Sequence, residues 1–202
     1  MRQIEFFFDC SSPWTYLAFS RIEALAARTR AQINWKPILV GGVFNAVNQE
    51  VYERRANADP RKAAYNGKDM MDWALLCGVS IKWPPTIFPV RSVAAMRGAF
   101  HALDAGRLPP YARNVFEAYW GDDRDIANPA VLEDCAVRSG LNGKAFLAAL
   151  DDPANKERLK ATTQELIDRG GFGSPTIFVN GSDMYFGNDR LPLVEAALER
   201  LP

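Results

Sequence analysis

The apolar positions near the N-terminus follow the pattern of a strand, a helix and a second strand. The run from Ile4 to Phe8 is largely apolar and too short for a helix, which predicts a buried strand. Residues 33–40 form a second run of this kind. A helix is predicted to start at Pro13, with an apolar face formed by Tyr16, Leu17, Ile22, Leu25 and Ala26. Together these elements predict a parallel, right-handed strand–helix–strand unit.

The middle of the chain, from Val43 to about Leu150, has a helical pattern that loops interrupt. A Pro-rich connection over residues 81–89 divides it. Asn128 and Pro129 suit the N-cap and the first position of one of its helices. The predicted helices cover residues 69–76, 92–105, 111–120, 129–139 and 145–150.

Strand patterns return near the C-terminus. Gly170-Gly171 stops a helix, and Asn180-Gly181 predicts a hairpin between two short strands. The expected order is a helix, two strands and a closing helix, over residues 155–169, 176–179, 184–186 and 191–201.

The order of the elements predicts an α/β protein, a thioredoxin-like fold with an inserted all-helical domain. Residues 1–42 and 156–202 are predicted to form the thioredoxin-like domain, with Gly41-Gly42 ending its second strand. Residues 43–155 are predicted to form the inserted helical domain.

Composition and charge narrow the class of protein. With 48% apolar and 24% charged residues, the 202-residue chain has an ordinary globular composition. It carries 24 Lys and Arg against 24 Asp and Glu, so binding to nucleic acid or to a membrane surface has no electrostatic support. No apolar run has the length of a membrane span, and no signal-peptide pattern precedes the first strand.

The cysteines give no support for a disulfide framework or a metal site. They are odd in number and far apart, at Cys10, Cys77 and Cys135. We therefore expect no metal and a reducing, cytoplasmic location.

The serine at the start of the first helix is a candidate functional residue. Ser12 is a good N-cap, and the strand-to-helix turn places its hydroxyl beside backbone N–H groups that lack a helical partner. Such a place can hold a negative charge. Taken alone, a Ser-Pro pair at a helix start is more typical of a simple cap.

A second motif, Ser174-Pro175-Thr176, supports a functional role for this turn. Proline favours extended geometry at Ser174, and a cis bond here would hold the backbone of Ser174 open to a ligand strand. A proline in this place, paired with a helix-start motif after the first strand, is the thioredoxin arrangement. Where thioredoxins carry Cys-x-x-Cys, this chain has Ser12-Pro13-Trp14-Thr15, so dithiol–disulfide exchange is impossible at this site.

Over nearly its whole length the chain resembles the 2-hydroxychromene-2-carboxylate isomerases and their relatives, the kappa-class glutathione transferases, within the DsbA-like superfamily. Each shared motif is weak alone, but the ordered set is specific. It comprises residues 8–17, Gly41-Gly42-Val43-Phe44, Pro60-Arg61-Lys62 with Tyr65 and Asp69, Tyr119-Trp120 with Asp125-Ile126, Gly173-Ser174-Pro175-Thr176 and Phe186-Gly187-Asn188-Asp189-Arg190. One departure is Cys10-Ser11, where relatives commonly carry bulkier apolar residues.

The resemblance implies glutathione as cofactor and Ser12 as the catalytic residue, with Ser11 its upstream neighbour. In the family, an asparagine in the loop after Gly-Gly-Val-Phe also belongs to the glutathione site. In this chain the spacing differs by one residue from that of the family. We assign Asn48 to this role, with Asn45 as the alternative. The other implied ligands are Lys62 for the glycyl carboxylate, the backbone of Ser174 before Pro175 for the cysteinyl unit, and Asn188 and Asp189 for the γ-glutamyl end.

The implied reaction is the isomerisation of a small aromatic electrophile. The thiolate adds to a conjugated double bond of an opened hydroxychromene, rotation follows, and glutathione leaves. Lowering the thiol pKa by about two units needs ~2.7 kcal/mol of preference for the thiolate. A helix N-terminus gives ~0.3–1 kcal/mol, and a hydrogen bond to a charged group adds roughly 1.5–3 kcal/mol. Ser12 is therefore expected to donate a hydrogen bond to the thiolate rather than act as a nucleophile.

Aromatic and cationic residues supply candidates for the electrophile's site. Trp14, Trp83 and Trp120 are candidates for an aromatic wall, although core packing is an equal alternative for each. Arg91 and Arg97 are candidates for a substrate carboxylate, although a solvated position is the ordinary interpretation for both.

Other functions remain open at this point. If the reaction stopped after glutathione had added to the electrophile, the protein would be a kappa-like glutathione transferase. A non-catalytic glutathione- or peptide-binding module is a further alternative. A serine hydrolase is disfavoured because Gly-x-Ser-x-Gly is absent and the single histidine, His101, lies in a helix rich in small residues. Relatives are commonly dimers, so a homodimer is expected.

Overall fold

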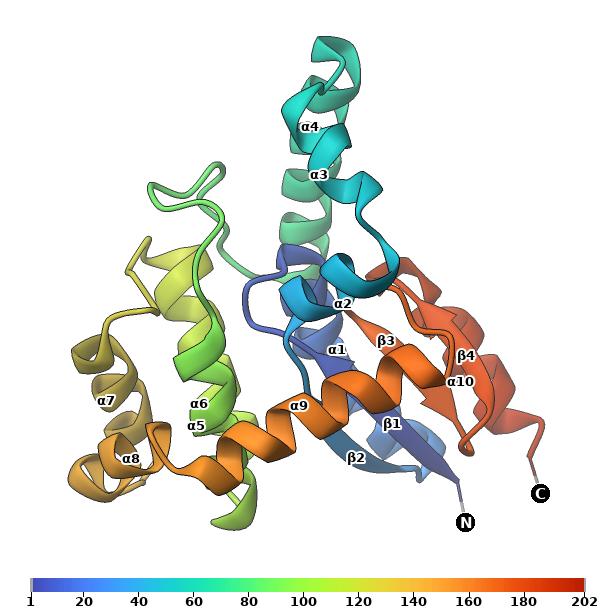
Figure 1. The fold of residues 1–202 in the computed structure, drawn as a ribbon. Coiled ribbons are helices and arrows are strands. Elements are labelled where there is room, and N and C mark those ends of the chain that lie inside the picture. The colour runs from blue at the N-terminus through green and yellow to red at the C-terminus, as the bar shows by residue number, and fades with distance from the viewer. Residues whose placement is uncertain (1, 202) are drawn as a thin grey trace.

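A computed structural model describes residues 2–201 and has a four-stranded sheet at its centre (Figure 1). The strands lie in the order β2-β1-β3-β4. β1 (Gln3–Phe8) and β2 (Gln32–Pro37) are parallel, whereas β3 (Thr176–Val179) runs antiparallel to β1 and β4 (Asp183–Phe186) antiparallel to β3. The sheet joins the N-terminal and C-terminal parts of the chain, which confirms the predicted strands at the two ends.

Helices near both ends of the sequence pack against the sheet. α1 (Pro13–Thr29) joins β1 to β2, α9 (Pro153–Asp168) precedes β3, and α10 (Leu191–Glu199) follows β4 after a short 3-10 turn, η2 (Asn188–Arg190). Figure 1 shows α9 crossing one face of the sheet, with α1 on the other side. The remaining elements lie between β2 and α9 in the sequence: α2 (Val40–Val47), α3 (Glu50–Ala56), α4 (Pro60–Cys77), α5 (Val93–Asp104), α6 (Leu108–Phe116), the π-helical turn η1 (Glu117–Gly121), α7 (Pro129–Arg138) and α8 (Gly143–Leu150).

β1 sends alternate side chains to opposite faces of the sheet. Ile4, Phe6 and Phe8 enter the main core, which also contains residues of α1, α10 and the central helices. Phe7 enters a smaller core beneath α9, together with Ile38, Val43, Leu166 and Phe178. Burial on both faces explains why this strand is a nearly continuous apolar run in the sequence.

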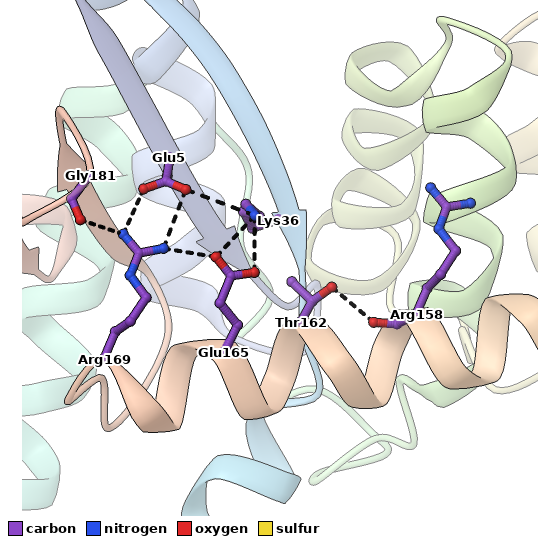
Figure 2. A network of polar contacts seen from close by, with 7 residues as sticks. All are labelled: Glu5, Lys36, Arg158, Thr162, Glu165, Arg169 and Gly181. Atoms are coloured by element: carbon purple, nitrogen blue, oxygen red, sulfur yellow. Dashed lines mark hydrogen bonds and ion pairs between the residues drawn. The ribbon is translucent and has the colours of Figure 1, made fainter.

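One charged residue of β1, Glu5, is buried. Figure 2 shows its contacts with Lys36 of β2 and with Arg169 at the end of α9. Its carboxylate accepts a hydrogen bond from Arg169 Nη2 at 2.6 Å and lies 3.8 Å from Lys36 Nζ. Glu165 bridges the same two cations, at 2.8 and 3.0 Å. The guanidinium of Arg169 also lies 3.8 Å from the ring centre of Phe178. Each charge has an opposite partner, so the network ties α9 to the sheet without an unpaired buried charge.

The prediction of a strand that reaches Val40 and stops at Gly41-Gly42 is wrong. β2 ends at Pro37 and α2 begins at Val40, so both glycines are helical. The Val40 N–H donates to the Asp9 carboxylate at 2.8 Å, and the Leu39 N–H donates to Thr163 Oγ1 at 3.0 Å. The groups that start this helix come from distant parts of the chain, and a local pattern does not reveal them.

The pair α3 and α4 stands out from the rest of the molecule in Figure 1. α4 starts at Pro60, well before the predicted start at residue 69, because the Asp59 side chain accepts bonds from the N–H groups of Arg61 and Lys62. Only Met70 and Ala74 of this helix are buried. α4 therefore packs against the rest of the protein mainly through the short segment that contains these two residues.

The cysteines, Cys10, Cys77 and Cys135, are all free thiols. Among residues 2–201 no group of three His, Cys, Asp or Glu side chains is placed to hold a metal ion. Across the same residues, every helix is too short or too polar to cross a membrane.

Candidate active site

Ser12 lies where β1 turns into α1 and has two hydrogen bonds. Its backbone is extended, with φ −103° and ψ 121°, and its Oγ accepts a bond from the Thr15 N–H at 3.3 Å. The same hydroxyl donates to the backbone carbonyl of Ser174 at 3.1 Å. Ser12 is therefore an N-cap, as predicted, and its single hydroxyl proton is directed at the loop before β3.

The loop before β3 is joined to the start of α1 by a second hydroxyl pair. The Ser174–Pro175 bond is cis, and Ser174 is buried. Its Oγ lies 2.7 Å from Thr15 Oγ1 and accepts a bond from the Asp9 N–H at 3.1 Å. The positions that hold two sulfurs in a thioredoxin motif, Ser12 and Thr15, thus both contact Ser174 through their hydroxyls.

Beneath this turn lies Asp9, a fully buried carboxylate. Its Oδ1 accepts a bond from the Ser11 N–H at 2.9 Å. Its Oδ2 accepts bonds from the Val40 N–H at 2.8 Å and the Ser92 hydroxyl at 3.0 Å. Burial raises the pKa of the Asp9 carboxyl, while these hydrogen bonds act to lower it. One carboxylate thereby connects the turn before Ser12 with the starts of α2 and α5.

The thiol nearest to Ser12 in the sequence, Cys10, is not exposed for chemistry. Cys10 is buried, and desolvation raises the pKa of its thiol well above the usual range. Its backbone carbonyl accepts a bond from Trp120 Nε1 at 3.0 Å. The chemistry available at this turn is therefore that of hydroxyls and backbone N–H groups.

Asn48 and Lys62 lie on different helices of the central part of the chain. Asn48 ends α2, and its Nδ2 donates to the carbonyl of Phe172 at 3.0 Å, two residues before Ser174. Asn45 is exposed and accepts a bond from the Tyr52 hydroxyl at 2.8 Å. This placement favours Asn48 over Asn45. Lys62 is exposed in the first turn of α4, and no ion pair involves it within the described chain.

Asn188 and Asp189 lie together in η2 but in different surroundings. Asn188 is buried, and both its backbone oxygen and its Oδ1 accept bonds from Arg21 Nη2 at 2.9 Å. The Arg21 guanidinium also lies 5.1 Å from the ring centre of Trp73. Asp189 is exposed and paired with the neighbouring Arg190. Asp189 therefore offers an exposed carboxylate, whereas Asn188 and Arg21 fix the turn that carries it.

Two of the three candidate tryptophans are in contact. Trp120 is fully buried, and Trp83 is stacked on it with ring centres 6.1 Å apart. Trp83 is 37% exposed, so one part of this pair belongs to the core and the other to the surface. Trp14 is half-buried against the main core, and no ring pair joins it to Trp83 or Trp120 in the described structure.

The two candidate arginines differ in direction. Arg97 donates to the carbonyl of Leu150 at 3.3 Å, which directs it toward the end of α8. Arg91 is exposed in the loop before α5. Neither contacts a residue of the Ser12 turn through a hydrogen bond or ion pair among residues 2–201.

The chain matches the DSBA-like thioredoxin domain family over residues 3–199. The chain belongs to this family. A 2-hydroxychromene-2-carboxylate isomerase of Pseudomonas putida is 31% identical over 98% of this chain and 95% of that protein. Human glutathione S-transferase kappa 1 is 25% identical over 96% and 89% of the respective chains. The resemblance to the isomerases, with the kappa-class transferases next, is thus confirmed.

Solved structures agree with this assignment to the DSBA-like family. A 2-hydroxychromene-2-carboxylate isomerase superposes with a TM-score of 0.80 at 29% identity, covering 98% of this chain and 95% of that one. A probable DsbA oxidoreductase of Streptomyces coelicolor superposes with a TM-score of 0.77 at 18% identity, which shows the shared fold. The thioredoxin-like fold with inserted helices is confirmed. Relatives named as isomerases and glutathione transferases support an enzymatic function for this DSBA-like protein.

Sequence reasoning missed two residues of this DSBA-like site, Asp9 and Arg21. A signal for each was present. Asp9 ends a run of buried phenylalanines, where a charged group needs hydrogen-bond partners. Arg21 lies one helical turn from both Leu17 and Leu25, on an otherwise apolar stripe.

One cavity of this DSBA-like protein lies away from Ser12. It has a volume of about 490 Å³ and lies between α1, the end of α4 and α6. Tyr16, Cys77, Arg113 and Glu117 line it, and none of the predicted glutathione ligands does. The cavity is therefore not the predicted thiol site.

Proposed function

We propose that this protein is a glutathione-dependent isomerase of the 2-hydroxychromene-2-carboxylate or trans-o-hydroxybenzylidenepyruvate type, acting in the breakdown of aromatic hydrocarbons. The observation that carries the proposal is the Ser12 hydroxyl at the start of α1, bonded to the Ser174 carbonyl before a cis proline. A hydroxyl in this place can donate to a bound thiolate, whereas a cysteine could exchange with oxidised glutathione to form a mixed disulfide. The similarity to named isomerases over nearly the whole chain supports the reaction type.

The assigned residues offer charges of opposite sign, as a tripeptide that is charged at both ends requires. Lys62 offers an exposed ammonium group for the glycyl carboxylate, and Asp189 an exposed carboxylate for the γ-glutamyl amine. The backbone of Ser174 is assigned to the cysteinyl unit, and Asn48 and Asn188 support the segments on either side. When bound, glutathione supplies the thiol that adds to the electrophile and later leaves.

Ser12 would stabilise the charged form of that thiol. No acidic residue lies in the first turn of α1, so the helix N-terminus favours an anion by ~0.3–1 kcal/mol. The hydroxyl must first leave the Ser174 carbonyl, which costs about 0.5–1.5 kcal/mol, before it gains roughly 1.5–3 kcal/mol as a donor to a charged acceptor. The net preference from the hydroxyl is then about 1–1.5 kcal/mol, comparable with the contribution of the helix.

A kappa-like glutathione transferase that conjugates another electrophile is the second candidate. Kappa-class transferases from human and rat are 25% and 24% identical to this chain over 96% of its length. The isomerase and the transferase reactions both need a stabilised thiolate. They differ in whether glutathione leaves the product again. A non-catalytic glutathione- or peptide-binding module would use the same contacts without turnover.

An assay of two electrophiles, each with and without glutathione, tests the proposal. We expect 2-hydroxychromene-2-carboxylate to isomerise only when glutathione is present, without consuming it. Conjugation of a standard aryl halide without isomerisation would favour the transferase. Glutathione binding without turnover of either compound would favour the binding module, and isomerisation at full rate without glutathione would contradict the proposal.

The resemblance also predicts a homodimer, and this stays a prediction. Leu75 and Leu76 near the end of α4 are 84% and 73% exposed. A second copy of the chain is a natural partner for such apolar side chains. Light scattering gives the mass directly, and a monomer at high protein concentration would contradict the prediction.

A further inference from the structure

A row of aromatic rings leads from the Ser12 turn to the protein surface. It begins at the buried Trp120, whose Nε1 holds the carbonyl of Cys10 at 3.0 Å. Trp83 stacks on Trp120 with an angle of 23° between the rings, and Phe88 meets the edge of Trp83 with ring centres 5.4 Å apart. Phe88 is 41% exposed. The row therefore starts at the backbone of Cys10, two residues before Ser12, and ends with ring surface open to solvent.

A cation lies at the outer end of this row. The guanidinium carbon of Arg55, in the last turn of α3, is 5.5 Å from the ring centre of Phe88 and 5.6 Å from that of Phe44 in α2. In Figure 1, α3 stands beside α4, away from the sheet. Two rings on separate segments thus hold Arg55 beside the aromatic row.

Arg55 lacks the acidic partner that its neighbour has. Arg54 pairs with Glu50 one turn earlier at 2.6 Å, whereas no hydrogen bond or ion pair joins the Arg55 guanidinium to another residue between 2 and 201. Rings cover the faces of a guanidinium and leave its N–H groups free. Such N–H groups match a carboxylate in a two-point contact.

We propose that Arg55 binds the carboxylate of a planar aromatic acid whose ring system lies along Trp83 and Phe88. The inference rests on the proposed function, because it assigns the substrate end of the same site. Apolar ring surface joined to one cation selects a conjugated aromatic carboxylate over a neutral aromatic electrophile. Arg55 replaces Arg91, because Arg91 has no ring contact in the described structure. It also replaces Arg97, because Arg97 is directed at Leu150.

Charge-selective kinetics test this role. Arg55→Gln and Arg55→Lys are compared with the matched control Arg54→Gln on the same short helix. We expect Arg55→Gln to raise the KM for 2-hydroxychromene-2-carboxylate about tenfold or more, which corresponds to one lost charged contact. Its kcat/KM for a neutral aryl halide should stay within about twofold of wild type, and Arg55→Lys should fall between. Arg54→Gln should match wild type with both compounds.

Two results would overturn the inference. An unchanged KM in Arg55→Gln shows that Arg55 does not meet the carboxylate. An equal loss with the charged and the neutral electrophile shows that Arg55 only holds α3 against Phe44 and Phe88. A urea unfolding curve for each variant identifies any loss of fold. If Arg55→Gln does not fold, Arg55→Lys, which keeps the charge, is used in its place.

A binding measurement separates this inference from the proposed function. If wild type turns over neither electrophile, quenching of tryptophan fluorescence by trans-cinnamate and by its methyl ester tests Arg55 without glutathione. We expect wild type to bind the acid more tightly than the ester, and Arg55→Gln to lose about tenfold for the acid alone. Equal affinity of wild type for acid and ester would overturn the assignment of Arg55, whatever reaction the protein performs.

Discussion

Replacing Asp9 by asparagine is expected to destabilise the fold by about 1–3 kcal/mol in mildly acidic solution. Oδ2 of Asp9 accepts bonds from Val40 and Ser92, and Oδ1 accepts one from Ser11. An amide oxygen in the place of Oδ2 keeps two of these bonds, but the amide NH₂ group then faces the N–H of Ser11. One buried donor is left without an acceptor, directly before Ser12.

The sign of the pH dependence tests the same reasoning. Burial raises the pKa of Asp9 above its ordinary value of 3.8. The folded protein then holds this proton more tightly than the unfolded chain does. The contribution of Asp9 to stability is therefore fully present below about pH 3.8 and is lost as the pH rises through the folded-state pKa. The asparagine of the variant does not titrate, so its contribution to stability does not change with pH. The difference in stability between wild type and Asp9→Asn should therefore narrow as the pH rises.

Urea unfolding followed by circular dichroism, from about pH 4.5 to about pH 8, measures this gap. Ser92→Ala is the control, because it removes one donor and keeps the carboxylate. Its loss of stability should be smaller, and wild type and Ser92→Ala should show the same pH trend. A gap between wild type and Asp9→Asn that widens with pH would contradict this prediction, since the hydrogen bonds would then outweigh desolvation and lower the pKa of Asp9.

Two further predictions concern ligand affinity and the ion network of Figure 2. Lys62→Ala and Asp189→Ala should each weaken glutathione binding about tenfold in calorimetry, and unchanged affinity in both would contradict their assignment. Arg169→Met should lower the free energy of unfolding by about 2–3 kcal/mol, because Glu5 loses its closest partner. Arg28, which pairs with Glu195 at the surface, gives the control, because Arg28→Met should leave the unfolding curve nearly unchanged. An equal loss of stability in Arg169→Met and Arg28→Met would contradict the prediction that the buried ion pair contributes more than the surface pair.

Elements defined by local pattern could be predicted from the sequence. The strand over residues 176–179 and the cap formed by Asn128 and Pro129 agree with the structure, because a short apolar run and a helix cap are each defined within a few residues. The meeting of Ser12 and Ser174, 162 positions apart, was predicted instead from the thioredoxin arrangement of the two motifs, and it occurs because β1 and β3 are neighbours in the sheet.

Features that depend on distant partners could not be predicted in this way. α2 begins at Val40 because Asp9 caps it from 31 residues away. Arg21 reaches Asn188 across 167 positions of sequence. Arg55 meets Phe44 and Phe88 only because α3 folds back over α2 and the loop before α5. Local periodicity carries no information about such long-range contacts, because they arise from tertiary packing.

The proposed role of the Ser12 hydroxyl is to stabilise a bound thiolate. Titration of that thiolate by ultraviolet absorbance, with glutathione bound, tests this role directly. Ser12→Ala removes the net preference of about 1–1.5 kcal/mol, so the midpoint should rise by about one pKa unit while glutathione affinity stays nearly intact. Ser11→Ala, the same change one residue earlier, should leave the midpoint where it is in wild type. Identical midpoints in wild type and Ser12→Ala would show that Ser12 only caps α1.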